Sequence, residues 1–204
     1  MPDSGGTIDI TGLGDPGDLL AHGAPATPAD PGLVHLADDV AVVAASFVAT
    51  VEGVAGGRAA DEAIALLLLE TAELARTGAR LGALTDVVPE GRFEPDAGRE
   101  PDVDRVREGL RGLFGDLDRY AVVGDPYGDP EVEEGSLGDD LAETVSDLLH
   151  GLAHHAAGRP MEALWWWQYA YLASWGEASL RALTALRALV ALVRLEAGAA
   201  ADAP

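Results

Sequence analysis

The sequence contains no cysteine and no lysine. Without thiolates the chain cannot form disulfides, cysteine-ligated zinc or iron–sulfur sites, or a cysteine nucleophile. Without lysine it cannot complete a phosphate-binding P-loop. The 204 residues, 48% of them hydrophobic, are enough for one domain with an ordinary core. We therefore expect a single domain that folds without a disulfide or structural metal, and the sequence predicts no cofactor.

Positive charge is also scarce, because 13 arginines face 35 acidic residues and leave a net charge of −22. Such a surface repels phosphate backbones and anionic lipids, so we expect neither direct nucleic-acid binding nor membrane association. Residues 86–147 hold 19 of the acids against 6 arginines, whereas residues 148–204 hold four of each. A solvated acidic surface is the usual explanation of this pattern. The alternatives are attraction of a basic protein partner, attraction of a cation, or a mimicry role, and the oligomeric state stays open.

The first residues include neither a basic nor an apolar segment typical of a secretory signal, and no uninterrupted apolar stretch reaches about 18 residues. We therefore expect a cytoplasmic protein. Residues 1–30 combine five aspartates with glycine and proline and show no apolar period, which predicts a disordered acidic tail. The expected helical domain spans residues 31–197, and residues 198–204 are expected to form a short flexible tail.

Apolar residues recur at spacings of three and four along most of residues 31–197, which predicts helices. No alternating β-branched run is long enough to predict a strand. The fold class is therefore all-α, a single bundle of about six helices. Ser136 is expected to cap the fourth helix, and Gly176 to end the fifth. The third helix is expected to reach Tyr120. Gly109, Gly112 and Gly115 inside it indicate either a close helix–helix approach or a weak helix, and the weak helix is the favoured interpretation. The six expected helices cover residues 31–55, 59–81, 103–120, 137–157, 160–175 and 177–196.

Aromatic residues make up only 5% of the chain, yet all four tryptophans lie between residues 165 and 175. Three consecutive tryptophans point about 100° apart on a helix, so this helix should be covered on most sides. Core packing is the commonest use of such residues. An aromatic box with one amide is the alternative, and its candidate ligand or partner residues are Trp165, Trp167, Gln168, Tyr171 and Trp175.

The fourth helix carries a polar stripe made of Asp140, Glu143, Asp147, His150 and His154. Within this stripe Asp147, His150 and His154 lie one turn apart and offer a candidate metal site. A carboxylate and two imidazoles at this spacing could bind a divalent metal ion. The apolar stripe of this helix lies nearly opposite, however, which is expected where a polar stripe simply faces water. No HExxH motif is present, and no triad or nucleophile elbow stands out, so no catalytic residue is assigned.

Several segments together resemble a family of uncharacterised actinobacterial proteins, the domain-of-unknown-function family DUF5063. The most specific segments are Leu149–Leu152, Gly158–Arg159 and Glu162–Gln168, followed by Tyr171 and Trp175–Gly176. The likeness extends upstream through Arg92–Pro95 and Asp125–Tyr127 to Phe47–Val48, and covers roughly residues 35–196. The resemblance implies a small, helical, cytoplasmic protein, and it transfers no catalytic residue.

Two functional hypotheses remain. The first is a non-enzymatic helical interaction module with an acidic surface and an aromatic-rich helix, which should expose apolar area beside the tryptophan helix. The second is a small-molecule or divalent-metal-binding protein, with or without enzymatic activity, whose site lies between the fourth and fifth helices. The sequence favours the first hypothesis and leaves enzymatic activity uncertain.

Overall fold

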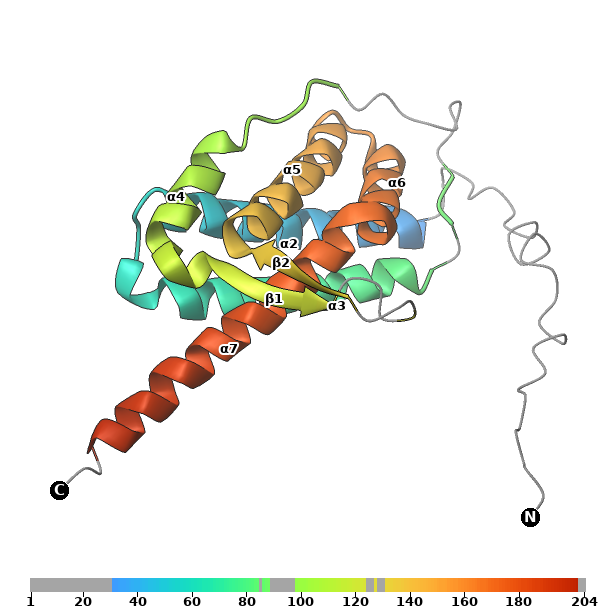
Figure 1. The fold of residues 1–204 in the computed structure, drawn as a ribbon. Helices are drawn as coiled ribbons and strands as arrows, with labels where there is room; N and C mark the ends of the chain where they lie inside the picture. Colours follow the sequence, from blue (N-terminus) through green and yellow to red (C-terminus); the bar gives the residue numbers. More distant parts are fainter. Residues whose placement is uncertain (1–30, 85, 89–97, 124–126, 128–130, 202–204) are drawn as a thin grey trace, which may run out of the picture.

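The computed structural model of the chain describes residues 31–84, 86–88, 98–123, 127 and 131–201. The predicted tail at residues 1–30 lies outside them. Helices dominate the fold and are labelled as in Figure 1. The elements in chain order are α2 (Pro31–Ala55), η1 (Ala60–Glu62), α3 (Ala63–Gly82), α4 (Asp104–Phe114), η2 (Gly115–Asp118), β1 (Arg119–Val123), β2 (Val132–Ser136), α5 (Leu137–Ala156), α6 (Pro160–Ala170), η3 (Tyr171–Trp175) and α7 (Gly176–Ala201).

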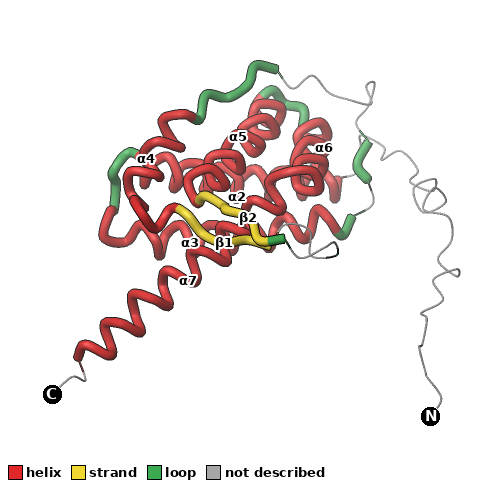
Figure 2. The backbone as a smooth tube through the Cα atoms, in the orientation of Figure 1, coloured by secondary structure: helices red, strands yellow, loops and turns green. Residues whose placement is uncertain are grey.

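The helices, drawn red in Figure 2, form one bundle, which confirms the predicted fold class. Helix α5 packs against α2, α4, α6 and α7, and α3 packs against α2 and α7. Helix α2 is long and apolar enough to cross a membrane by length and composition, but it packs against α3, α4, α5 and α6. The side chains with no exposed surface at the centre include Phe47, Leu67, Leu74, Leu110, Leu141, Leu148, Leu164 and Leu186.

A short antiparallel hairpin corrects the prediction that the chain has no strand. Strand β1 pairs with β2 from Arg119 opposite Ser136 to Val123 opposite Val132. Gly115 has a φ of 54° at the end of α4, and the chain then leaves the helix. The predicted extension of that helix to Tyr120 is therefore wrong. Neither five-residue strand alternates apolar and polar residues, so the pattern that predicts a strand is missing from both segments of the sequence.

Two buried aspartates attach the hairpin to the bundle. Asp118 accepts hydrogen bonds from the Ser136 hydroxyl (2.7 Å) and the Gly138 amide (2.8 Å). Ser136 in turn accepts one from the Asp139 amide (3.2 Å), which confirms its predicted role as the N-cap of α5. Asp140 accepts one from the Tyr120 hydroxyl of β1 and pairs with the Arg181 guanidinium of α7 at 2.8 Å.

The expected stop at Gly176 is wrong, because the chain passes from α6 through the π-helical turn η3 directly into α7. A Cβ at Gly176 would lie 2.2 Å from the Tyr171 carbonyl oxygen. The glycine is needed for this close backbone contact within the π turn and does not end the helix. Helix α7 then continues to Ala201, past the expected end near residue 196.

The glycines of α4 differ in role. A Cβ at Gly109 would lie 2.3 Å from the carbonyl oxygen of Ala55 at the end of α2, so this glycine permits a close helix–helix approach. The weak-helix interpretation is wrong at that position. Gly112 has open space around it and fits the interpretation.

We predict that Gly151→Ala destabilises the protein, because a Cβ there would lie 2.1 Å from Nε1 of the buried Trp167. Overpacking of this kind costs about 2 kcal/mol, more than the helix propensity that alanine adds. Gly112→Ala is the matched control and should raise the unfolding free energy by about 0.5–1 kcal/mol. Urea denaturation measures both, and equal effects of the two substitutions would contradict the packing described here.

Candidate functional site

Two of the four tryptophans on α6 and η3 belong to the hydrophobic core. Trp167 and Trp175 have no exposed surface. The Trp167 indole N–H donates to the Leu148 carbonyl of α5, and the Trp175 indole N–H donates to the Trp167 carbonyl, each at 3.2 Å. The ring centroids of Tyr171 and Trp175 lie 5.0 Å apart, and the Tyr171 ring fills the space left by Gly78 on α3. Three of the five candidate box residues therefore hold helices together and do not line an open box.

Gln168 is also a structural residue, because its amide joins α6 to the end of α3. Its Oε1 accepts from the Val87 backbone N–H at 2.8 Å, and its Nε2 donates to the Leu81 carbonyl at 3.0 Å. The side chain is buried and so is Val87. A polar residue in this place satisfies a buried backbone donor on the segment that follows α3.

The remaining candidate, Trp165, belongs to an exposed aromatic patch formed with Tyr169 and Leu172. Trp165 and Tyr169 stack with ring centroids 5.2 Å apart, while Tyr169 is 54% and Leu172 65% exposed. A hollow of about 280 Å³ lies against them, and it is also lined by Asp86, Val87, Val88 and Gln168. The expected coverage of this helix on most sides is therefore incomplete, and apolar area is exposed beside it.

The three candidate metal ligands do not converge on one point. The Nδ1 of the buried His154 lies 2.8 Å from Glu162 Oε2. The His154 ring also stacks on the Trp166 ring, with centroids 6.2 Å apart. His150 also lies against Trp166, at 5.5 Å. Asp147 instead accepts a hydrogen bond of 2.5 Å from Ser174 in η3. Among the described residues no group of three or more histidine and acidic side chains is arranged to hold a metal ion.

The polar stripe on α5 does not face water along its length, contrary to the interpretation that its pattern favoured. Asp140 and His154 at its two ends are only 4% and 2% exposed. The elements that cover them supply polar partners, namely Tyr120 and Arg181 for Asp140 and Glu162 for His154. Periodicity cannot reveal burial of this kind, because it assumes that the covering surface is apolar.

Asp147 and Glu143 instead line an acidic cleft of about 570 Å³ between α4 and α5. Arg107 is the one arginine in its lining, and it pairs with Asp104 (2.7 Å) and Asp139 (3.1 Å). In the part of the chain that the structure describes, no arginine pairs with the other four carboxylates. The acidic side chains that line the cleft are Glu100, Asp102, Asp104, Asp139, Glu143 and Asp147.

The fold places the Asp147 carboxyl where burial disfavours its ionised form. Burial raises its pKa above the ordinary value of 3.8, against the hydrogen bond from Ser174, and the negative charge of Glu143 raises it further. The Ser174 Oγ also lies 3.0 Å from Glu143 Oε1, so its one proton can bond either carboxylate and both stay beside it at the cleft wall. Sequence analysis missed Ser174 and Glu143 as partners, since their contact depends on the π turn.

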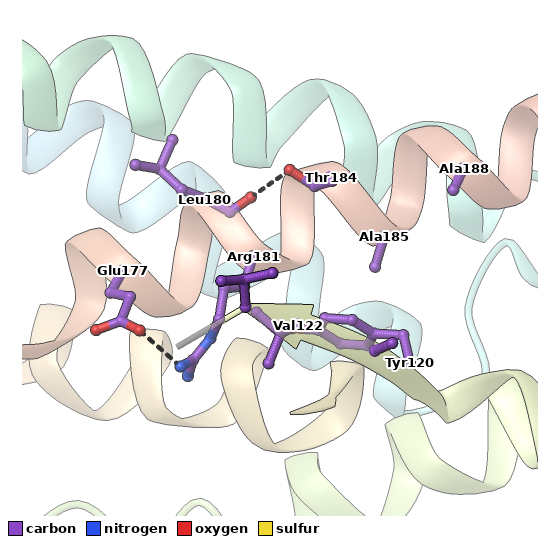
Figure 3. Close-up of a pocket in the computed structure, with 10 residues that line it drawn as sticks. Tyr120, Val122, Glu177, Leu180, Arg181, Thr184, Ala185 and Ala188 are labelled. Atoms are coloured by element: carbon purple, nitrogen blue, oxygen red, sulfur yellow. Dashed lines mark hydrogen bonds and ion pairs between the residues drawn. The ribbon is translucent and has the colours of Figure 1, made fainter. Parts of the chain in front are cut away.

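A larger groove, of about 770 Å³, lies between β1 and one face of α7 (Figure 3). Its walls are mostly apolar. Arg181 at its floor is already engaged, by Glu177 at 2.9 Å and Asp140 at 2.8 Å. Burial raises the pKa of Tyr120, which lines the same groove, and the Asp140 carboxylate adds to the rise. These groups anchor the hairpin, and the sequence did not predict the groove because it did not predict the hairpin.

We predict that Gln168→Met destabilises the protein by about 2 kcal/mol, because the buried Val87 N–H loses its acceptor while the side-chain volume is kept. The neighbouring Tyr169→Phe, on an exposed ring, should change the unfolding free energy by less than about 0.5 kcal/mol. Thermal and urea unfolding compare the two. Similar small losses in both variants would show that the amide does not tie α6 to the segment after α3.

We predict that Asp147→Asn stabilises the protein at neutral pH. A carboxyl whose pKa is raised on folding binds its proton more tightly in the folded state, so its contribution to the unfolding free energy falls as pH rises from about 3.8 through the raised pKa. The gain from the asparagine should therefore be full at pH 7 and should vanish below the unfolded-state pKa. Urea denaturation from pH 3.5 to 7.5 measures it, and a loss at neutral pH would contradict the assigned cost.

Comparison with known proteins agrees with the fold. The crystal structure of protein BF1032 from Bacteroides fragilis is similar, with a TM-score of 0.59 and 18% identity, over 74% of this chain and 89% of that chain. At this identity the likeness concerns the fold alone. Comparison with curated proteins gives no match. The family model described as a domain of unknown function, DUF5063, matches residues 33–192, and the chain therefore belongs to the DUF5063 family.

Proposed function

We propose that the protein is a non-enzymatic interaction module that binds a basic segment of a partner protein in the cleft between α4 and α5. The observation that carries the proposal is the charge of this cleft. Of the six carboxylates that line it, Asp104 pairs with Arg107, Asp139 pairs with Arg107 and Arg111, and the other four have no arginine partner among the described residues. Uncompensated carboxylates in a concave site focus the negative potential and attract a cationic side chain.

The unfavourable burial of the Asp147 carboxylate supports the same function. Burial disfavours its ionised form, so the free protein holds a carboxylate where a neutral side chain would be more stable. An arginine or lysine from a partner would pair with Asp147 and Glu143 and offset this cost on binding. Binding energy would then come from charges that lack an arginine partner in the described part of the free chain.

The aromatic patch of Trp165, Tyr169 and Leu172 supplies a second feature typical of binding surfaces. Tyrosine and tryptophan are enriched at protein interfaces, where their rings give apolar contact area. The π turn contributes to both features, because Ser174 bonds the cleft carboxylates while Leu172 lines the hollow beside the patch. With a net charge of −22, the chain favours a basic protein over a nucleic acid or an anionic membrane.

We predict that a fluorescent nona-arginine peptide binds the protein and that Glu143→Gln with Asp147→Asn weakens binding about tenfold, or about 1.4 kcal/mol. The expected cause is the loss of the two cleft carboxylates that have no arginine partner among the described residues. Fluorescence anisotropy at fixed ionic strength measures the affinity, since such binding depends on salt.

The matched control is Glu131→Gln with Glu133→Gln, which removes the same charge from exposed positions on the hairpin. This control should weaken binding less than threefold. Equal losses in the two double variants would mean that the peptide responds to net charge alone, and the cleft would not be the binding site.

A further inference from the structure

The groove between β1 and α7 is open along one face of α7. Small side chains form its floor on the helix, and Val122 on β1 faces it from the other side (Figure 3). Most of the side chains that line the groove are apolar, and its arginine is engaged within the chain. Its chemistry therefore suits apolar side chains. The helix residues along it are Glu177, Leu180, Arg181, Thr184, Ala185 and Ala188.

The same face of α7 continues past the groove into the part of the helix that projects from the bundle (Figure 1). At 100° per residue, Leu192 and Leu195 fall within about 80° of Ala185 and Ala188. Leu192 is 44% and Leu195 is 74% exposed. One helix face thus presents small residues beside an open groove and, one to three turns further on, two large exposed leucines.

We propose that this face binds a second copy of the chain, with α7 packed antiparallel against α7 of its partner. A twofold axis between residues 188 and 192 sets each Leu192 opposite Ala188 and each Leu195 opposite Ala185 of the other copy. The large side chains of each helix then fill the space above the small ones of its partner. A twofold interface needs such self-complementarity, since the same patch serves both copies.

This face of α7 carries little charge for so acidic a chain. Its charged side chains within residues 176–195 are Glu177 and Arg181, which pair with each other at 2.9 Å. At 100° per residue, Arg187 and Arg194 fall on the other side of the helix and Glu196 continues the face. Two copies that meet through α7 keep the acidic segments of a chain with a net charge of −22 apart. A basic peptide would find fewer carboxylates here than in the acidic cleft, and the small and large side chains of the face complement one another, so a second copy is the favoured occupant.

The oligomeric mass of the full chain tests the proposal. Light scattering and analytical ultracentrifugation at about 100 μM should give a dimer. Leu192→Glu with Leu195→Glu should shift the dimer dissociation constant at least thirtyfold toward monomer. The control Val42→Glu with Leu69→Glu, at exposed positions on α2 and α3, should leave it within about threefold. A monomeric wild-type chain, or equal shifts in both variants, would overturn the proposal.

Disulfide trapping tests the antiparallel register, with no background because the chain lacks cysteine. Ala185→Cys with Leu195→Cys should form a covalent dimer on mild oxidation. The two sites lie about 15 Å apart along one helix, too far for a bond within the chain. Leu195→Cys alone should form no covalent dimer under the same oxidation, because each Cys at this position faces Ala185 of the other copy, whereas a parallel pair would cross-link through it. A dimer that the double variant does not trap would overturn this arrangement.

Discussion

The contact of the Trp167 indole with the backbone of α5 is the constraint on which the rest of the structure depends. The ring lies where a side chain on Gly151 would be, and its N–H donates to the Leu148 carbonyl. This contact fixes how α6 lies on α5. With α6 in place, Gln168 reaches the segment after α3, and the π turn brings Ser174 to the carboxylates at the cleft wall.

The buried tryptophans stabilise the fold, and the surfaces available for binding lie elsewhere in the molecule. The most unusual segment of the sequence, residues 165–175, is mainly core, because Trp167 and Trp175 are fully buried and hydrogen-bonded to backbone carbonyls. Its exposed aromatic edge is formed by Trp165 and Tyr169, with Leu172 beside them. The features that can meet another molecule lie where carboxylates outnumber arginines and where α7 leaves the bundle.

The helices could be predicted from the sequence because their apolar spacing is long and regular, as in the stretch that became α2. The Ser136 cap was equally accessible, since capping depends on neighbouring residues. The hairpin, the π turn and the acidic cleft could not be predicted, because each depends on contacts between distant segments. The Tyr120–Asp140–Arg181 cluster joins three elements, and the spacing of Asp147, His150 and His154 does not reveal that they point to different partners.

The central claim is that recognition occurs at the cleft between α4 and α5 while the buried tryptophans serve the fold. Amide chemical-shift mapping of the isotope-labelled full chain, titrated with a basic peptide, tests it most directly. The account predicts the largest shifts at Asp102, Glu143, Asp147 and Ser174, with smaller ones at Tyr169 and Leu172. Shifts centred on β1 and the face of α7, or spread evenly over the acidic residues, would contradict it.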